Sequence, residues 1–229
     1  MKRFWKDVVV GDDRGVLLDG RPVRTPARAP LLLPTPALAE AVAEEWRAQE
    51  KDVDPWSMPM TGLANAAIDR VAPDPTAFAA GLADYGETDL LCYRAADPAP
   101  LVKRQNAEWN PLLDWARGRY DIHFALVTGI MHHPQPAETV ARLGEAIAAN
   151  GPFRLAALAP LVTIGGSLVI ALSLSEGAIA AEAAFAAAHV DELWQAEQWG
   201  EDSFALKTRA AHERDFLAAA RFLVLAGDN

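Results

Sequence analysis

Cysteine is nearly absent from this chain of 229 residues, which contains Cys92 alone. A single cysteine can form no intramolecular disulfide, and a zinc site built on several thiolates is excluded. Its neighbours Leu90, Leu91 and Tyr93 predict a small buried side chain rather than a catalytic nucleophile. A chain with so little cysteine fits a reducing compartment such as the cytoplasm.

Positive charge and long hydrophobic runs are also scarce. Lysine and arginine number 21 against 31 acidic residues, a formal net charge of −10, which disfavours a nucleic acid as a partner. The most apolar run, residues 161–174, is about 14 residues long, whereas a membrane-spanning helix needs roughly 20. The first residues lack the apolar segment of a secretory signal. We therefore expect a soluble, cytoplasmic protein without membrane insertion.

Motifs for phosphate, metal or nucleophilic chemistry are missing as well. Gly165-Gly166 lacks the Lys-Ser/Thr that completes a phosphate-binding loop, and Ser167 does not stand in the turn motif of a serine hydrolase. His132 and His133 are adjacent, so their side chains point to different sides of any regular element, and no third ligand stands at a suitable spacing. We expect no metal, no cofactor and no catalytic residue.

One stretch keeps an enzymatic alternative open. Glu87, Asp89 and Arg94 lie close together in the sequence. They are interpreted either as a loop tied by an acid–arginine pair or as a carboxylate pair. The alternative function is a small hydrolase that uses Glu87, Asp89 or Glu192 as acid or base. It would require a concave site in which burial raises the pKa of a carboxylate near a second polar group.

The first third of the chain predicts strands. Apolar, β-branched residues favour a strand over residues 3–10, and Asp19-Gly20 predicts a tight hairpin between residues 16–18 and 21–25. A further strand is expected over residues 29–33. Thr35-Pro36 then predicts a helix start, with threonine as N-cap and proline in the first turn. The proline-rich connector at 52–59 separates a β-rich lobe, residues 1–57, from a mainly helical lobe, residues 58–229.

Helical periodicity dominates after residue 60, apart from a possible strand near 122–128. The fold class is therefore expected to be α+β, with a small β-rich N-terminal lobe followed by a larger helical C-terminal lobe. Helices are expected over residues 61–71, 75–85, 100–119, 139–150, 153–174 (as one broken or two short helices), 178–199 and 203–225.

The helix expected over 178–199 carries an unusual mixture of side chains. On a continuous helix Glu192 shares one stripe with His189, Gln195 and Trp199, while Trp194 points to the far side. Such a helix should be packed on two faces, and a buried carboxylate is costly without a cation. We therefore expect Glu192 to have a partner, either within the protein or in another molecule.

Five short motifs in order carry a resemblance over almost the whole chain. The motifs are Leu18–Pro26, Met58–Arg70, Tyr85–Arg94, Arg104-Gln105 followed by Trp109, and Asp191–Asp202. With these motifs in this order, the chain resembles the assembly chaperones of the F-type ATP synthase that escort its α subunit in mitochondria and α-proteobacteria.

The resemblance implies a two-domain α+β protein that acts by binding rather than by catalysis. Its expected partner is the unassembled α subunit, which it would keep from aggregating and release when the β subunit arrives. A monomer is expected, in the cytoplasm of bacteria or the mitochondrial matrix of eukaryotes. Related chains often continue with further acids where this one has Ser203-Phe204. The partner-binding residues implied are Glu192, Gln195, Trp199, Gly200, Glu201 and Asp202.

Overall fold

The computed structural model describes residues 2–200 and 202–227, which form two compact units. The first unit comprises Met1–Pro75, Asn150–Ala157 and Ala218–Asn229, and the second comprises Thr76–Ala149 and Leu158–Leu217. The boundary expected after residue 57 falls inside the first unit, so the division by contacts differs from the one that the proline-rich connector suggests. Within the described ranges, no helix is both long and apolar enough to cross a membrane.

A three-stranded antiparallel sheet opens the first unit. Strands β1 (Val8–Val10), β2 (Val16–Leu18) and β3 (Arg21–Pro22) follow in the order β1-β2-β3. The predicted hairpin is confirmed, because Asp19 and Gly20 both have positive φ, at 47° and 76°.

Two of the predicted strands in this unit are wrong in length or kind. The strand expected over residues 3–10 pairs only from Val8 onward. Residues 29–33 form isolated bridges, Gly15 with Leu32 and Arg24 with Pro30, rather than a strand. Pro30 and Pro34 have no backbone N–H to donate, which limits a regular ladder here.

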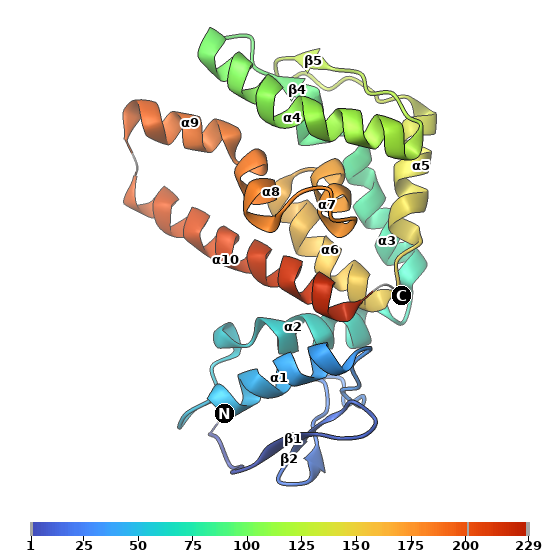
Figure 1. The fold of residues 1–229 in the computed structure, drawn as a ribbon, viewed down its shortest axis with the longest axis vertical. Helices are drawn as coiled ribbons and strands as arrows, with labels where there is room; N and C mark the ends of the chain where they lie inside the picture. Colours follow the sequence, from blue (N-terminus) through green and yellow to red (C-terminus); the bar gives the residue numbers. More distant parts are fainter. Residues whose placement is uncertain (1, 201, 228–229) are drawn as a thin grey trace. The chain divides into compact units, whose positions relative to one another are not determined.

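Helix α1 (Pro36–Ala48) covers the hairpin within the first unit (Figure 1). Thr35 Oγ1 accepts a hydrogen bond from the backbone N–H of Leu38 at 3.1 Å, so the predicted N-cap is confirmed. The buried face of α1 includes Trp46, whose ring lies edge-on to Trp5 with centroids 5.1 Å apart.

A short 3₁₀ turn, η1 (Pro55–Ser57), precedes helix α2 (Pro59–Ala66). Helix α2 packs on α1 and continues as a π-helical turn, η2 (Ala67–Val71). The Glu45 carboxylate on α1 joins the two helices. It accepts hydrogen bonds from the backbone N–H of Met60 at 2.7 Å and of Thr61 at 2.8 Å. These contacts explain why residues beyond the connector belong to the first unit.

The rest of the chain is mainly helical, which confirms the α+β class. The strand expected near 122–128 is reduced to β5 (Val127–Thr128), which pairs in parallel with β4 (Tyr93–Arg94). The remaining elements are α3 (Pro75–Ala83), η3 (Asp84–Gly86), η4 (Leu90–Cys92), α4 (Ala99–Tyr120), α5 (Ala137–Ala148), α6 (Pro152–Gly165), α7 (Leu168–Ser175), α8 (Ala181–Ala188), α9 (Val190–Trp199) and α10 (Ser203–Ala226).

Helix α7 lies at the core of the second unit, against α4, α5 and α8. Every residue from Leu168 to Leu174 is buried, as expected for the most apolar run in the chain. Gly166, with φ of 63°, separates α7 from α6. The glycine pair in this segment therefore marks a helix end.

The single helix expected over 178–199 is wrong, because the chain breaks at His189 into α8 and α9. His189 has φ of −112° and ψ of 22°, outside helical values. Its Nδ1 lies 2.9 Å from the carbonyl oxygen of Phe185, and the two rings stack with centroids 3.9 Å apart. A side chain that bonds to a nearby carbonyl in this way competes with the helical hydrogen-bond ladder.

Candidate functional site

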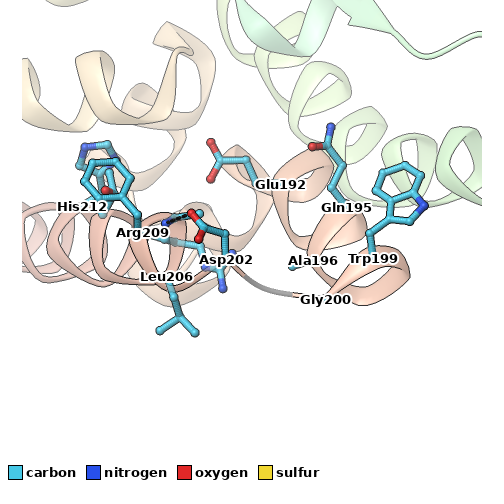
Figure 2. A pocket seen from close by; sticks show the side chains of 12 residues that line it. Glu192, Gln195, Ala196, Trp199, Gly200, Asp202, Leu206, Arg209 and His212 are labelled. Carbon is cyan, nitrogen blue, oxygen red and sulfur yellow. Dashed lines mark hydrogen bonds between the residues drawn. The ribbon is translucent and has the colours of Figure 1, made fainter.

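An open groove lies between α9 and α10 in the second unit (Figure 2). Its volume is about 470 Å³, and we call it the α9–α10 groove. Five of the six residues implied by the resemblance line it, and Glu201 lies outside the described residues. The lining residues are Glu192, Gln195, Ala196, Trp199, Gly200, Asp202, Phe204, Ala205, Leu206, Thr208, Arg209 and His212.

One face of α9 forms the first wall of the groove. Glu192, Gln195, Ala196 and Trp199 have the spacing of neighbours on a helix surface. The prediction that this helix is packed on two faces is wrong, since Val190 alone is buried in α9. Glu192 is exposed and has no hydrogen bond or ion pair with the residues that the structure describes.

The other side of α9 is attached to α4 by polar contacts. Gln105 Nε2 donates to Asp191 Oδ1 at 2.7 Å, and Arg104 donates to both carboxylate oxygens of Glu197 at 2.8 Å. Gln105 is itself buried, and its Oε1 accepts from the backbone N–H of Ala95 at 2.8 Å. These contacts use the polar groups opposite the groove, so the Glu192 face is left open to solvent.

The first half of α10 forms the second wall. From Ser203 to Asp215 no side chain is buried, and burial in this helix begins at Phe216, which contacts Phe185. Asp202 Oδ2 accepts from the backbone N–H of Ala205 at 3.2 Å, a capping contact at the start of the helix. Before it, Gly200 ends α9 with φ of 84°, a conformation that favours glycine.

Large aromatic side chains stand exposed at the end of the groove near Gly200. Trp199 is 79% exposed and Phe204 is 76% exposed. By contrast, Trp109 on α4 is buried and donates its indole N–H to the carbonyl of Ala187 at 2.8 Å. Exposed aromatic rings beside acidic groups are typical of surfaces that bind another protein.

Sequence reasoning missed the α10 wall. Ala205, Thr208, Arg209 and His212 follow the same helical spacing as the α9 wall, so the pattern was present in the sequence. Nothing local indicated that this half of α10 is unburied, because its alanines and Leu206 would equally suit a packed helix. Only the folded arrangement shows which residues face α9.

Two carboxylates of the enzymatic alternative, Asp89 and Glu87, have separate structural contacts. Asp89 is fully buried and accepts from the backbone N–H groups of Leu91 and Val169, both at 3.0 Å, and from the Ser167 hydroxyl at 2.8 Å. Burial raises the pKa of Asp89 above its usual value. A shifted pKa can mark a catalytic acid, but here the carboxylate is closed off from solvent and caps η4 and α7.

The acid–arginine pair expected for this stretch is wrong. Arg94 donates to the Leu91 carbonyl at 2.9 Å and to Asn106 Oδ1 at 3.1 Å, and lies over the Trp109 ring. Glu87 Oε1 accepts from the backbone N–H of Gln135 at 3.3 Å. Glu87 Oε1 also lies 3.8 Å from His132 Nε2, so Arg94 and Glu87 contact other groups rather than each other.

The remaining groups with metal or thiol chemistry are dispersed or shielded. His132 and His133 are exposed in a loop, and residues 2–200 and 202–227 contain no cluster of three or more potential metal ligands. Cys92 is buried, and burial raises the pKa of its thiol to about 12. At neutral pH this thiol is therefore protonated and a poor nucleophile.

An open groove with exposed aromatics and carboxylates is typical of proteins that bind another protein, and the comparisons give the family. The family of the ATP12 chaperone protein matches residues 2–117. The mitochondrial protein atp12 of Schizosaccharomyces pombe is 24% identical over 214 residues, covering 87% of this chain and 74% of that protein.

Solved structures agree with that match over nearly the whole chain. Atp12 from Paracoccus denitrificans is 42% identical, with a TM-score of 0.93 and coverage of 99% of this chain and 98% of that one. A protein from Agrobacterium tumefaciens is 45% identical, with a TM-score of 0.92 and coverage of 97% and 85%. The chain belongs to the ATP12 chaperone family, the ATP synthase assembly chaperones that the sequence motifs resemble.

Proposed function

We propose that this protein binds the unassembled α subunit of the F-type ATP synthase, prevents its aggregation and releases it to the β subunit. The observation that carries the proposal is the α9–α10 groove, in which Trp199 and Phe204 stand exposed beside the carboxylates of Glu192 and Asp202. Membership in a family of assembly chaperones supports a protein client.

The chemistry of the groove suits a temporary complex. A ring subunit made alone exposes an interface intended for its neighbour, and such a patch promotes aggregation. A chaperone that covers the patch lowers the concentration of the exposed species by mass action. An open groove with few large side chains gives enough affinity for protection while leaving the natural partner able to compete.

The residues assigned to this contact are those of the expected site. Trp199 supplies the apolar contact, Glu192 and Asp202 supply negative charge, and Gln195 and Gly200 complete the α9 side. Glu201 is assigned through the sequence resemblance. The protein is expected to act as a monomer in the bacterial cytoplasm.

The direct test is co-expression of the α subunit with and without this protein. We expect more α subunit in the supernatant when the protein is present, and recovery of a complex by size-exclusion chromatography. Addition of the β subunit should displace the protein from that complex. If the α subunit stays equally soluble without it and no complex forms, the proposal is wrong.

Glu192→Lys tests whether the groove makes the contact. Glu192 is exposed and has no partner among the described residues, but it lies in the first turn of α9, where a carboxylate interacts favourably with the helix dipole. The change should therefore lower the free energy of unfolding by no more than about 1 kcal/mol. Binding to the α subunit should weaken by at least about tenfold.

The matched control is Glu108→Lys, the same charge reversal at an exposed position on α4 outside the groove. It should bind the α subunit as the unmodified protein does. Equal binding by both variants would argue against a contact at Glu192, and a large loss of stability in the Glu192 variant would indicate a structural role.

A further inference from the structure

The two walls of the groove differ in side-chain size along their length. Ala196 and Gly200 on one wall, and Ala205 and Thr208 on the other, are small residues. Trp199 and Phe204 are large and lie where the two walls approach the turn. Small residues let the backbone of an occupant come close, while the rings offer an apolar contact at one end.

The walls constrain the backbone of that occupant. Both are helices, whose backbone N–H and C=O groups are paired within each helix except in the last turn of α9 and the first turn of α10. An extended segment gains affinity by adding to a sheet edge, and here it would leave its own backbone groups without protein partners. A helix satisfies its backbone internally, so a helical occupant fits these walls better.

Charge is placed asymmetrically in the groove. Glu192 precedes Trp199 by seven residues on α9, which is about 10 Å along the helix axis. Its exposed carboxylate has no partner among the described residues, whereas Arg209 and His212 line the facing wall. A basic side chain of an occupant is therefore favoured beside Glu192 on α9.

We propose, on the basis of the proposed function, that the client segment in the α9–α10 groove is an amphipathic helix with an apolar anchor and a lysine or arginine seven residues apart. The anchor contacts Trp199 and Phe204, and the basic group pairs with Glu192. The spacing follows because a helix lying along α9 has the same rise per residue as α9 itself.

The test uses labelled synthetic helical peptides of about 18 residues with one tryptophan anchor. One peptide carries lysine seven residues from the anchor, and a second carries glutamate at that position. In a third peptide the lysine is moved two positions from that place, to another side of the helix. Fluorescence anisotropy with the full-length protein should show the first peptide binding at least about tenfold more tightly than the second. The third should bind more weakly than the first, because its lysine faces away from Glu192.

Protein variants then locate the contact. Trp199→Ala should weaken binding of the lysine peptide by at least about tenfold. Trp56→Ala removes a tryptophan that is 82% exposed in the first unit and should have no effect. Glu192→Lys should reverse the preference, so that the glutamate peptide becomes the tighter ligand.

Several outcomes would overturn the proposal. They are equal binding of the lysine and glutamate peptides, no binding of any peptide at millimolar concentration, or equal losses in the two tryptophan variants. A concentration-dependent dimer abolished by Trp199→Ala would assign the groove to a second copy of this chain. If the peptides fail while the α subunit is still protected, only the helical segment is refuted; if the α subunit is not protected, the proposed function fails.

Discussion

Helices α7 and α9 belong to the same unit but are held in place in different ways. In α7, seven of eight residues are buried, whereas in α9 one of ten is buried. Full burial of an aliphatic side chain stabilises by about 1.5–3 kcal/mol, whereas an exposed ion pair contributes about 0–1 kcal/mol. Packing therefore fixes α7, and polar contacts to α4 fix α9.

The difference shows how one unit can combine a stable core with a surface free to bind. A helix that packs its apolar side chains inward has none left for a partner, as in α7. Because α9 is attached through Asp191 and Glu197, its aromatic and acidic face stays available. As a consequence, the free energy of local unfolding should be lower for α9 than for α7.

Among the polar contacts, the largest effect is expected when the support of α7 is removed. Asp89→Ala leaves two buried backbone N–H groups and the Ser167 hydroxyl without their acceptor. We expect the free energy of unfolding to fall by about 3 kcal/mol or more, measured by urea denaturation. Glu87→Ala, at a half-buried neighbouring acid, is the control and should cost much less.

A smaller effect is expected at the buried amide beneath α9. Gln105→Ala removes the acceptor for Ala95 N–H and the donor to Asp191, at a cost of about 1–3 kcal/mol. Hydrogen exchange should quicken in α9 more than in α7. Asn110→Ala removes an exposed amide on the same helix, and it should change neither the free energy of unfolding nor the hydrogen exchange of α9. Equal loss of protection in both helices would contradict separate anchoring.

The ion pair at the surface should matter less still. Arg104→Ala removes both contacts to Glu197, and since both groups are partly exposed the cost should be below about 1 kcal/mol. Exchange in α9 should rise modestly, and added salt should reproduce the change in the unmodified protein. Arg117→Ala breaks an exposed pair with Asp114 on the same helix and should leave α9 unaffected.

The smallest effect on stability is expected at the exposed ring of Trp199. Trp199→Ala should alter the free energy of unfolding by less than about 0.5 kcal/mol, because the side chain is 79% exposed. Trp109→Ala should lower it by about 3–5 kcal/mol, because that ring is buried. A large melting shift for Trp199→Ala would show that α9 is packed more closely than the structure indicates.

Features decided by local chemistry could be predicted from the sequence. The Asp19-Gly20 hairpin depends on two residues with positive φ, and the Thr35 cap depends on one hydroxyl and one proline. The order of the helices followed from periodicity, and the α+β class followed from that order. The motif in α9 pointed to residues that do line a groove.

Features that helical periodicity does not record could not be predicted. The alanine-rich segment keeps its helical pattern through His189, so the pattern did not mark the break between α8 and α9, where His189 contacts Phe185. The expected burial of Glu192 assumed one continuous helix packed on two faces. Which face of α9 is covered depends on Arg104 and Gln105, about ninety residues earlier in the chain.

The buried thiol of Cys92 has a practical consequence. With its pKa raised to about 12 and its side chain enclosed, it should resist alkylation in the folded protein at neutral pH. A cysteine introduced at Ala196, on the groove wall, would then be the one thiol open to reagents. A cross-linker or spin label could thus be attached there without replacing the native Cys92, and the client segment could be identified by mass spectrometry.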